Sequence, residues 1–220
     1  MIIINFKAYT ESMGIKGLRI AKICEKVSRE TSVLMAIAPQ MCDLAWMSRE
    51  ISIPVFAQHV DAIEPGSRTG LISPEAIKIA GAAGTLLNHS EHPMKIADIR
   101  LVIGRCRQLG LVTCVCASDV KTIETCAVLR PDYVAIEPPE LIGGAQSVVE
   151  ANPEAVRKAV NSVRMIDEKI KVLCGAGITD AADVAKALSL GTQGILIASG
   201  IVKSKHIEKT LRAMANEFRT

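Results

Sequence analysis

The sequence of 220 residues predicts a single-domain α/β fold of the (β/α)8 barrel type. Three observations lead to this prediction. Eight short apolar runs lack the alternation of half-exposed strands, which is typical of parallel strands covered on both faces. Each run precedes a longer segment with helical periodicity, and no linker or change of composition divides the chain. Polar residues and glycines follow several of the runs, where a barrel of this type carries its active site.

The eight units follow one another in order along the chain. The predicted strands span residues 2–6, 33–38, 55–58, 84–88, 111–116, 133–136, 172–174 and 194–198. The predicted helices span residues 14–29, 41–49, 74–80, 94–109, 119–129, 153–168, 181–190 and 205–217. We therefore assign residues 1–220 to one domain, because the pattern runs through the chain without a break.

Several helix ends carry clear signals. Ser73-Pro74-Glu75 and Asn152-Pro153-Glu154 each combine an N-cap residue, a proline in the first turn and an early acid. Gly110 and Gly191 stand where C-terminal glycines belong. The alternative fold is an open doubly wound sheet, which usually carries a G-x-G-x-x-G turn after its first strand. Here the first strand runs into Asn5-Phe6-Lys7, so the barrel is the better prediction.

The composition narrows the class of protein. Apolar residues make up 49% and aromatic residues 3%, so the core is expected to be aliphatic. A net charge of +3 favours neither nucleic acid nor a membrane surface as a partner.

No apolar run approaches the ~20 residues that span a bilayer, and no signal peptide is evident, so a cytoplasmic location is expected. The seven cysteines are odd in number and lack a C-x-x-C pair, so we expect buried thiols rather than disulfides or a metal site.

The residues that follow the strands suggest proton-transfer chemistry. His89 and Glu91 follow the fourth strand, Glu137 ends the sixth, and Asn5 and Lys7 lie at the end of the first. Histidine and glutamate are common proton-transfer groups, and all of these ends meet at one rim of a barrel. Taken singly, each residue also fits a structural role, such as a core histidine or a solvated lysine. Their convergence on one rim favours a catalytic site.

Glycine-rich turns after the last strands complete this picture. Gly175 and Gly177 follow the seventh strand, and 198–200 follow the eighth, where such barrels usually bind phosphate. Pro138-Pro139 and Gly143-Gly144 flank an apolar segment, which predicts a lid over residues 138–145. His59 is expected to have a structural or interface role, and His92 and His206 have no evident function.

These motifs, taken together, resemble triosephosphate isomerase. The similarity rests on Asn5-Phe6-Lys7, His89-Ser90-Glu91, Glu137-Pro138-Pro139 and residues 194–200, in the same order and at matching strand ends. Three segments are similar to the short archaeal-type branch: Ala57-Gln58-His59, residues 137–142 with Gly143, and residues 173–178. The resemblance extends from residue 2 to the last helix. It implies a TIM barrel that interconverts dihydroxyacetone phosphate and D-glyceraldehyde 3-phosphate in glycolysis and gluconeogenesis.

The resemblance also implies roles for single residues. Glu137 would be the base, His89 the electrophile that polarises the carbonyl, and Lys7 the cation that stabilises the enediolate and the phosphate. Glu91 would position Lys7, and Thr69 would reach into the site of a neighbouring subunit. The residues expected to contact the substrate are Asn5, Phe6, Lys7, Ile142, Gly177, Ala198 and Ser199.

The same resemblance implies no metal or organic cofactor, and a homodimer or homotetramer as the assembly. The chain departs from the family at Gly143-Gly144-Ala145, where Gly-Thr-Gly is usual, and at His92-Pro93, where basic residues are common. Two other functions remain open from the sequence. One is a different phosphate-binding barrel enzyme of sugar-phosphate or amino-acid biosynthesis, and the other is a degenerate barrel without activity.

Overall fold

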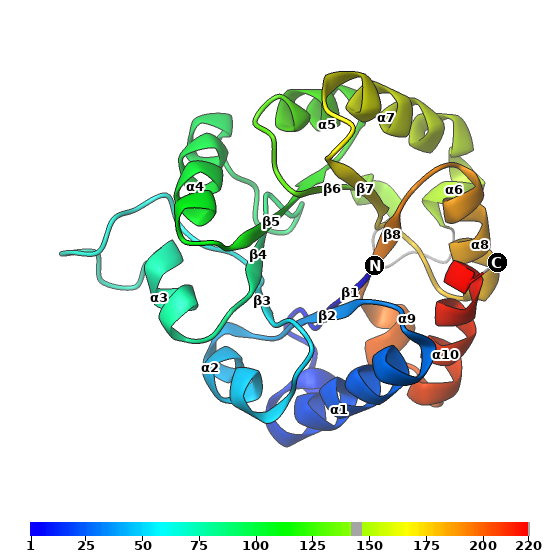
Figure 1. Cartoon of the computed structure of the whole chain (residues 1–220), viewed down its shortest axis with the longest axis horizontal. Helices are drawn as coiled ribbons and strands as arrows, with labels where there is room; N and C mark the ends of the chain where they lie inside the picture. Colours follow the sequence, from blue (N-terminus) through cyan, green and yellow to red (C-terminus); the bar gives the residue numbers. More distant parts are fainter. Residues whose placement is uncertain (142–146, 220) are drawn as a thin grey trace.

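The computed structural model describes residues 1–141 and 147–219. In this part of the chain, eight parallel strands form a nearly closed barrel in the sheet order β2-β1-β8-β7-β6-β5-β4-β3 (Figure 1). A parallel bridge between Ile37 and Val55 joins the two edges, and the Ile37 N–H donates to the Pro54 carbonyl oxygen at 3.1 Å. The strands are β1 (Ile2–Asn5), β2 (Met35–Ala38), β3 (Phe56–Ala57), β4 (Gly84–Leu87), β5 (Val112–Ala117), β6 (Tyr133–Ile136), β7 (Lys171–Cys174) and β8 (Gly194–Ile197).

The helices surround the barrel as an outer ring (Figure 1). They are α1 (Gly14–Thr31), α2 (Met41–Glu50), α3 (Pro74–Ile79), α4 (Ile96–Gln108), α5 (Val120–Ala127), α6 (Val148–Ala151), α7 (Pro153–Ile166), α8 (Ala181–Ser189), α9 (Ser199–Val202) and α10 (Ile207–Asn216). Short 3-10 turns are η1 (Thr10–Ser12), η2 (Pro139–Leu141) and η3 (Glu217–Arg219). The predicted N-caps are confirmed, because Ser73 and Asn152 accept hydrogen bonds from the N–H groups of Ala76 and Ala155.

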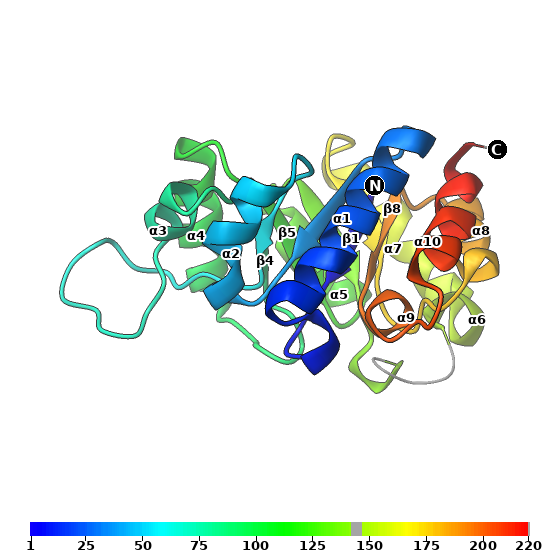
Figure 2. The ribbon, with the colours of Figure 1, turned by 90° about the horizontal axis from the view of Figure 1, so that it is seen from below.

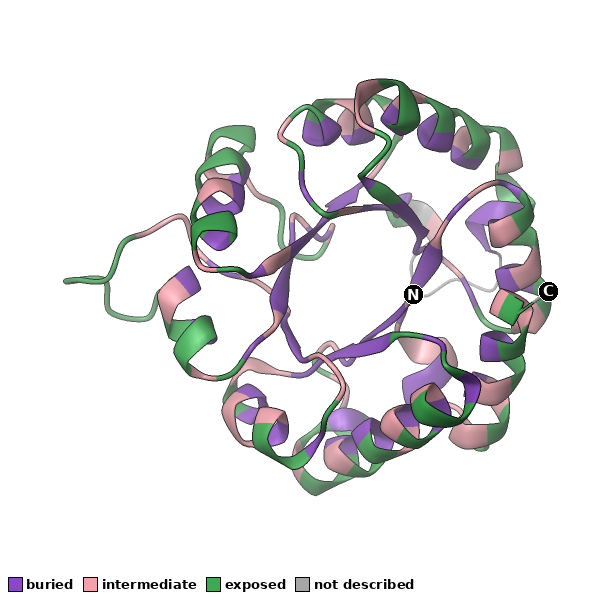
Figure 3. Ribbon diagram, viewed as in Figure 1, coloured by how far each residue is buried: buried purple, intermediate pink, exposed green. Residues whose placement is uncertain are grey.

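Two layers of apolar side chains hold the barrel together. Most strand residues are buried, as the mainly purple ring of strands in Figure 3 shows. One layer fills the barrel interior and contains Ile3, Phe56, Leu86, Cys114, Cys116, Leu173 and Leu196. The second and larger layer lies between the strands and the helices. The predicted aliphatic core and the (β/α)8 barrel are therefore confirmed.

Some elements differ from the sequence prediction in length. The predicted strand 55–58 contains only the two residues of β3, and the helix predicted from residue 94 begins at Ile96. The four-residue helices α6 and α9 were not expected. They are too short for a helical period to be visible in the sequence.

The projecting loop, the cysteines and the lengths of the helices can also be compared with the expectations from sequence. The loop from Asp61 to Ile72 projects away from the barrel beside α3 (Figure 2). All seven cysteines are free thiols, and six of them are buried as expected, whereas Cys42 is exposed. Among the described residues, no helix has the length and apolarity needed to cross a membrane.

Candidate active site

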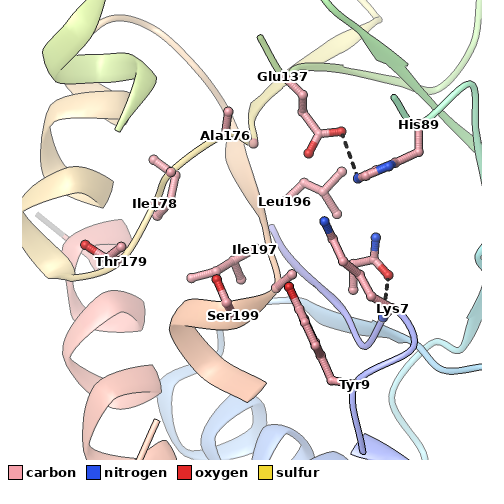
Figure 4. A pocket seen from close by; sticks show the side chains of 14 residues that line it. Lys7, Tyr9, His89, Glu137, Ala176, Ile178, Thr179, Leu196, Ile197 and Ser199 are labelled. Atoms are coloured by element: carbon pink, nitrogen blue, oxygen red, sulfur yellow. Dashed lines mark hydrogen bonds and ion pairs between the residues drawn. The ribbon is translucent and has the colours of Figure 1, made fainter. Parts of the chain in front are cut away.

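A polar pocket lies at the carboxyl ends of the strands, inside the ring of loops (Figure 4). Loops after β1, β4, β6, β7 and β8 all contribute to it. The lining residues are Asn5, Lys7, Tyr9, His89, Glu137, Gly175, Ala176, Gly177, Ile178, Thr179, Leu196, Ile197, Ala198 and Ser199. The structure thus brings together residues from five strand ends, as the sequence predicted.

Lys7 is held in an unusual backbone conformation at the pocket wall. Its φ of 45° lies in the left-handed region, which costs free energy for a residue with a side chain. The buried Asn5 accepts a hydrogen bond from the Lys7 N–H at 3.0 Å, and Gln58 donates to the Lys7 carbonyl oxygen at 3.0 Å. The Lys7 Nζ pairs with Glu91 Oε1 at 2.8 Å. These contacts fix a cation at the pocket, with its side chain only 10% exposed.

The hydrogen bonds of His89 indicate which ring nitrogen carries the proton. The backbone N–H of Glu91 donates to His89 Nδ1 at 3.2 Å, so this nitrogen acts as an acceptor. A neutral imidazole then has its proton on Nε2. The loop that carries His89 is fastened by Asn88, which donates to the Cys116 carbonyl oxygen and accepts from the Met94 N–H, both at 2.9 Å. The Nε2–H is therefore available to an atom inside the pocket.

Glu137 directs a buried carboxylate at the same space. It is 5% exposed, and its Oε2 lies 3.8 Å from His89 Nε2 (Figure 4). Within residues 1–141 and 147–219, this oxygen has no hydrogen-bond partner. Burial raises the pKa of Glu137 above its ordinary value, although His89, the Cys116 thiol and Lys7 lower it in part. A raised pKa increases the basicity of the carboxylate, as a general base requires.

The opposite end of the pocket is formed by the turns after β7 and β8. Gly177 has a φ of +72°, which a residue with a side chain rarely adopts. Thr179 is anchored by Asp183, whose Oδ2 accepts from its N–H at 2.8 Å and from its hydroxyl at 3.0 Å. Ala198 and Ser199 lie beside this turn at the start of α9. These two adjoining turns line the pocket, and their backbone N–H groups suit an anionic group of a ligand.

Other predicted site residues lie elsewhere. The Phe6 side chain is fully buried in the layer between the strands and the helices, and it does not line the pocket. Thr69 lies on the projecting loop, away from the pocket of its own chain. Ile142 and the predicted lid segment Gly143-Gly144-Ala145 fall outside the described residues, so the lid remains a prediction from sequence.

The structure adds Tyr9 and Thr179, which the sequence did not single out, and shows the contacts of three residues that the sequence had named. Tyr9 and Thr179 line the pocket, and Gly175 contacts the side chain of Glu137 so closely that it has no room for a Cβ. Beside the pocket, the rings of His59 and His92 stack at 3.8 Å between centroids. Gly175 had a sequence signal as part of the glycine turn after β7, and His59 and His92 were named from the sequence without a catalytic role, whereas Tyr9 and Thr179 were not named. Their positions depend on how the loops fold.

Fold and pocket together define a class of protein. It is a (β/α)8 barrel with a buried carboxylate, a histidine and a lysine around a pocket suited to an anionic ligand. Comparison with known proteins identifies the family within this class. The family model described as triosephosphate isomerase matches residues 1–214. The chain belongs to the triosephosphate isomerase family.

Individual relatives give the same result. The triosephosphate isomerase of Methanocaldococcus jannaschii is 51% identical over 214 residues, which cover 97% of this chain and 98% of that protein. The triosephosphate isomerase of Methanothermus fervidus is 45% identical over 218 residues, covering 99% of this chain and 98% of that protein. The one from Archaeoglobus fulgidus is 46% identical over 214 residues, covering 97% and 96%. The predicted resemblance to the archaeal branch is thereby confirmed.

Proposed function

We propose that this protein interconverts D-glyceraldehyde 3-phosphate and dihydroxyacetone phosphate through an enediolate. The observation that carries the proposal is the approach of Glu137 Oε2 to His89 Nε2 at 3.8 Å, beside Lys7, in a chain of the triosephosphate isomerase family. Such a reaction moves a proton between adjacent carbons. It needs a base, a donor to the oxygen that becomes negative, and a site for the phosphate.

In this mechanism Glu137 removes the proton from one carbon and returns it to the next. Its burial supports the role, because a raised pKa makes the carboxylate a stronger base. The neutral His89 donates its Nε2–H to the substrate oxygen and stabilises negative charge as it develops there. The Glu91 N–H preserves this tautomer by donating to Nδ1. No metal or organic cofactor takes part in the proposed steps.

Lys7 provides the positive charge that the enediolate and the phosphate require. Glu91 positions the Lys7 ammonium through the 2.8 Å ion pair, and Asn5 holds the backbone of Lys7 in place. Backbone N–H groups near Gly177, Ala198 and Ser199 would bind phosphate oxygens at the far end of the pocket. Phe6 would support the site through packing, and Ile142, beyond the described residues, would contact the substrate.

The direct test is a coupled assay with D-glyceraldehyde 3-phosphate. Glu137→Gln keeps the shape of the side chain but cannot accept the proton, so kcat should fall by at least ~10²–10⁴-fold. Glu154→Gln, an exposed glutamate on α7, is the matched control and should keep wild-type activity. A Glu137→Gln variant within tenfold of the wild-type kcat would exclude Glu137 as the base. An inactive wild type would exclude the proposed reaction.

We also propose a homo-oligomer, either a dimer or a tetramer, in the cytoplasm. The projecting loop of residues 61–72 supports the assembly, since a second copy could receive it and Thr69 could then approach the partner's pocket. Seven free thiols support a reducing compartment. The proposed substrate is a small molecule, and neither nucleic acid nor a membrane is a proposed partner.

A further inference from the structure

Tyr9 is the one tyrosine in the lining of the active-site pocket, and no step of the proposed mechanism uses it. Figure 4 shows its ring entering the pocket, with the hydroxyl end directed between Lys7 and Ser199. Glu137 and His89 lie at the other end of the view. In the described part of the chain, the hydroxyl forms no hydrogen bond of its own. A phenol O–H in this position is available to a ligand.

The loop that carries Tyr9 is built to hold it. Ser12, only 1% exposed, lies with its Oγ 2.8 Å from the Phe6 carbonyl oxygen and 3.0 Å from that of Tyr9. The Tyr9 ring also packs against the core layer between the strands and the helices. Tyr9 is therefore held at its backbone by Ser12 and at its ring by the core layer, while no hydrogen bond within the described residues occupies its hydroxyl.

Lys203 contacts one face of the Tyr9 ring. It follows α9, the helix that begins at Ser199, and its Nζ lies 4.3 Å from the centroid of the Tyr9 ring. A cation at this distance is attracted to the face of an aromatic ring. The contact joins the loop after β1 to the segment after β8. It holds the hydroxyl at the end of the pocket where the backbone suits an anion.

We propose that the Tyr9 hydroxyl donates a hydrogen bond to the phosphate group of the substrate, and that Lys203 is a positioning residue that orients the Tyr9 ring for this contact. The inference rests on the proposed function and deepens it by adding a side-chain donor to the phosphate site. An anion at this end would then be bound by backbone N–H groups, by Lys7 and by one neutral hydroxyl. Charge-assisted hydrogen bonds of this kind are stronger than neutral ones.

Tyr9→Phe tests the hydroxyl alone, because the ring and its contact with Lys203 remain. The dissociation constant of inorganic phosphate, measured by calorimetry, should rise about tenfold or more, as should the KM for D-glyceraldehyde 3-phosphate. The rate with unphosphorylated D-glyceraldehyde should not change, since this substrate lacks the group that Tyr9 contacts. Unchanged phosphate affinity would overturn the inference. An equal loss with D-glyceraldehyde would also overturn it, because the hydroxyl would then serve the site in general.

Lys203→Met tests the positioning role. It should weaken phosphate binding several-fold in the wild-type background and have no effect in Tyr9→Phe, because both changes act through one hydroxyl. Lys203→Arg keeps a cation over the ring and should restore binding. Lys205→Met removes a nearby exposed lysine as the matched control and should leave the affinity unchanged. A Lys203→Met effect that persists in Tyr9→Phe would show a direct charge effect and overturn the positioning role.

The two proposals can fail separately. If the wild type does not isomerise the triose phosphate, the proposed reaction is wrong, yet calorimetry with inorganic phosphate still measures the Tyr9 contact. If the wild type is active and Tyr9→Phe binds phosphate normally, only the inference about Tyr9 is wrong.

Discussion

At the scale of single residues, the Glu137 side chain occupies space that is open because Gly175, the residue that follows β7, has no Cβ. A Cβ added to Gly175 would lie 2.7 Å from both Cδ and Oε1 of Glu137. The added Cβ would lie closer still to Cγ of Glu137, so turning the carboxylate alone would not relieve the clash and the whole side chain must move. We expect Gly175→Ala to lower kcat about 100-fold, because small displacements of a catalytic group have effects of that size. A coupled assay measures the loss, and thermal unfolding should show that the fold is retained.

Gly104→Ala is the matched control for this substitution. Gly104 lies within α4, and a Cβ there would meet no atom within 4 Å. Alanine forms helices better than glycine by about 1 kcal/mol, so this variant should gain stability and keep full activity. If Gly175→Ala turned over at the wild-type rate, the position of the Glu137 carboxylate would not depend on the space left by Gly175.

The residues of the site differ in how far sequence alone could reveal them. Lys7, His89 and Glu137 each follow a strand closely, so the strand pattern alone assigned them to one rim. Tyr9 could not be assigned in this way. Its direction depends on the left-handed backbone at Lys7 and on the contacts of Ser12, which no local pattern specifies. Likewise, the tautomer of His89 follows from a backbone N–H that only the folded loop brings into place.

At the scale of elements, the strands were predicted well because burial on both faces leaves a continuous apolar run. The long helices were also predicted well, because an apolar stripe along one face and recognisable cap residues mark each of them in the sequence. The predicted first and last residues of strands and helices were less accurate where tertiary contacts decide where an element ends. In the segment 55–58, β3 has only two residues, and Val55 before it joins β2 through a single bridge. The helices α6 and α9 span a single turn each and leave no period to detect.

The loops after β3 and β4 meet in a histidine stack that should make the stability depend on pH. His59 stacks on His92, and its Nδ1 is buried without a hydrogen-bond partner in the described structure. Burial, with a smaller influence from His92, lowers the pKa of His59 below its ordinary value of 6.5, while Asp61 opposes this shift. As the pH falls below 6.5, the unfolded chain therefore takes up a proton more readily than the folded one. Stability should fall over this window.

Denaturant unfolding at a series of pH values tests the role of His59. The free energy of unfolding should decrease between pH 7 and a pH below 6.5, and this decrease should be smaller in His59→Gln than in the wild type. His206→Gln removes an exposed histidine at the start of α10 and should leave the slope unchanged. Equal slopes for His59→Gln and the wild type would mean that another group causes any loss of stability in acid.

At the scale of the whole molecule, the nearly closed barrel is surrounded by helices, and one loop extends beyond this outline (Figure 2). Residues 64–71 of this loop are exposed, including Leu71 at 49%. A long loop of this kind is uncommon in a compact domain unless it has a function. Docking onto a second copy would bury it, which is the physical basis of the proposed homo-oligomer.

Leu71→Glu should dissociate this assembly, because a charge would replace an apolar side chain at the proposed contact. Light scattering at micromolar concentration should give a multiple of 23.5 kDa for the wild type and a lower mass for the variant. Met165→Glu is the matched control, since Met165 is 89% exposed on α7, away from the loop. It should leave the mass unchanged. A wild type of 23.5 kDa with full activity would contradict the oligomer, and an unchanged mass in Leu71→Glu would exclude Leu71 from the interface.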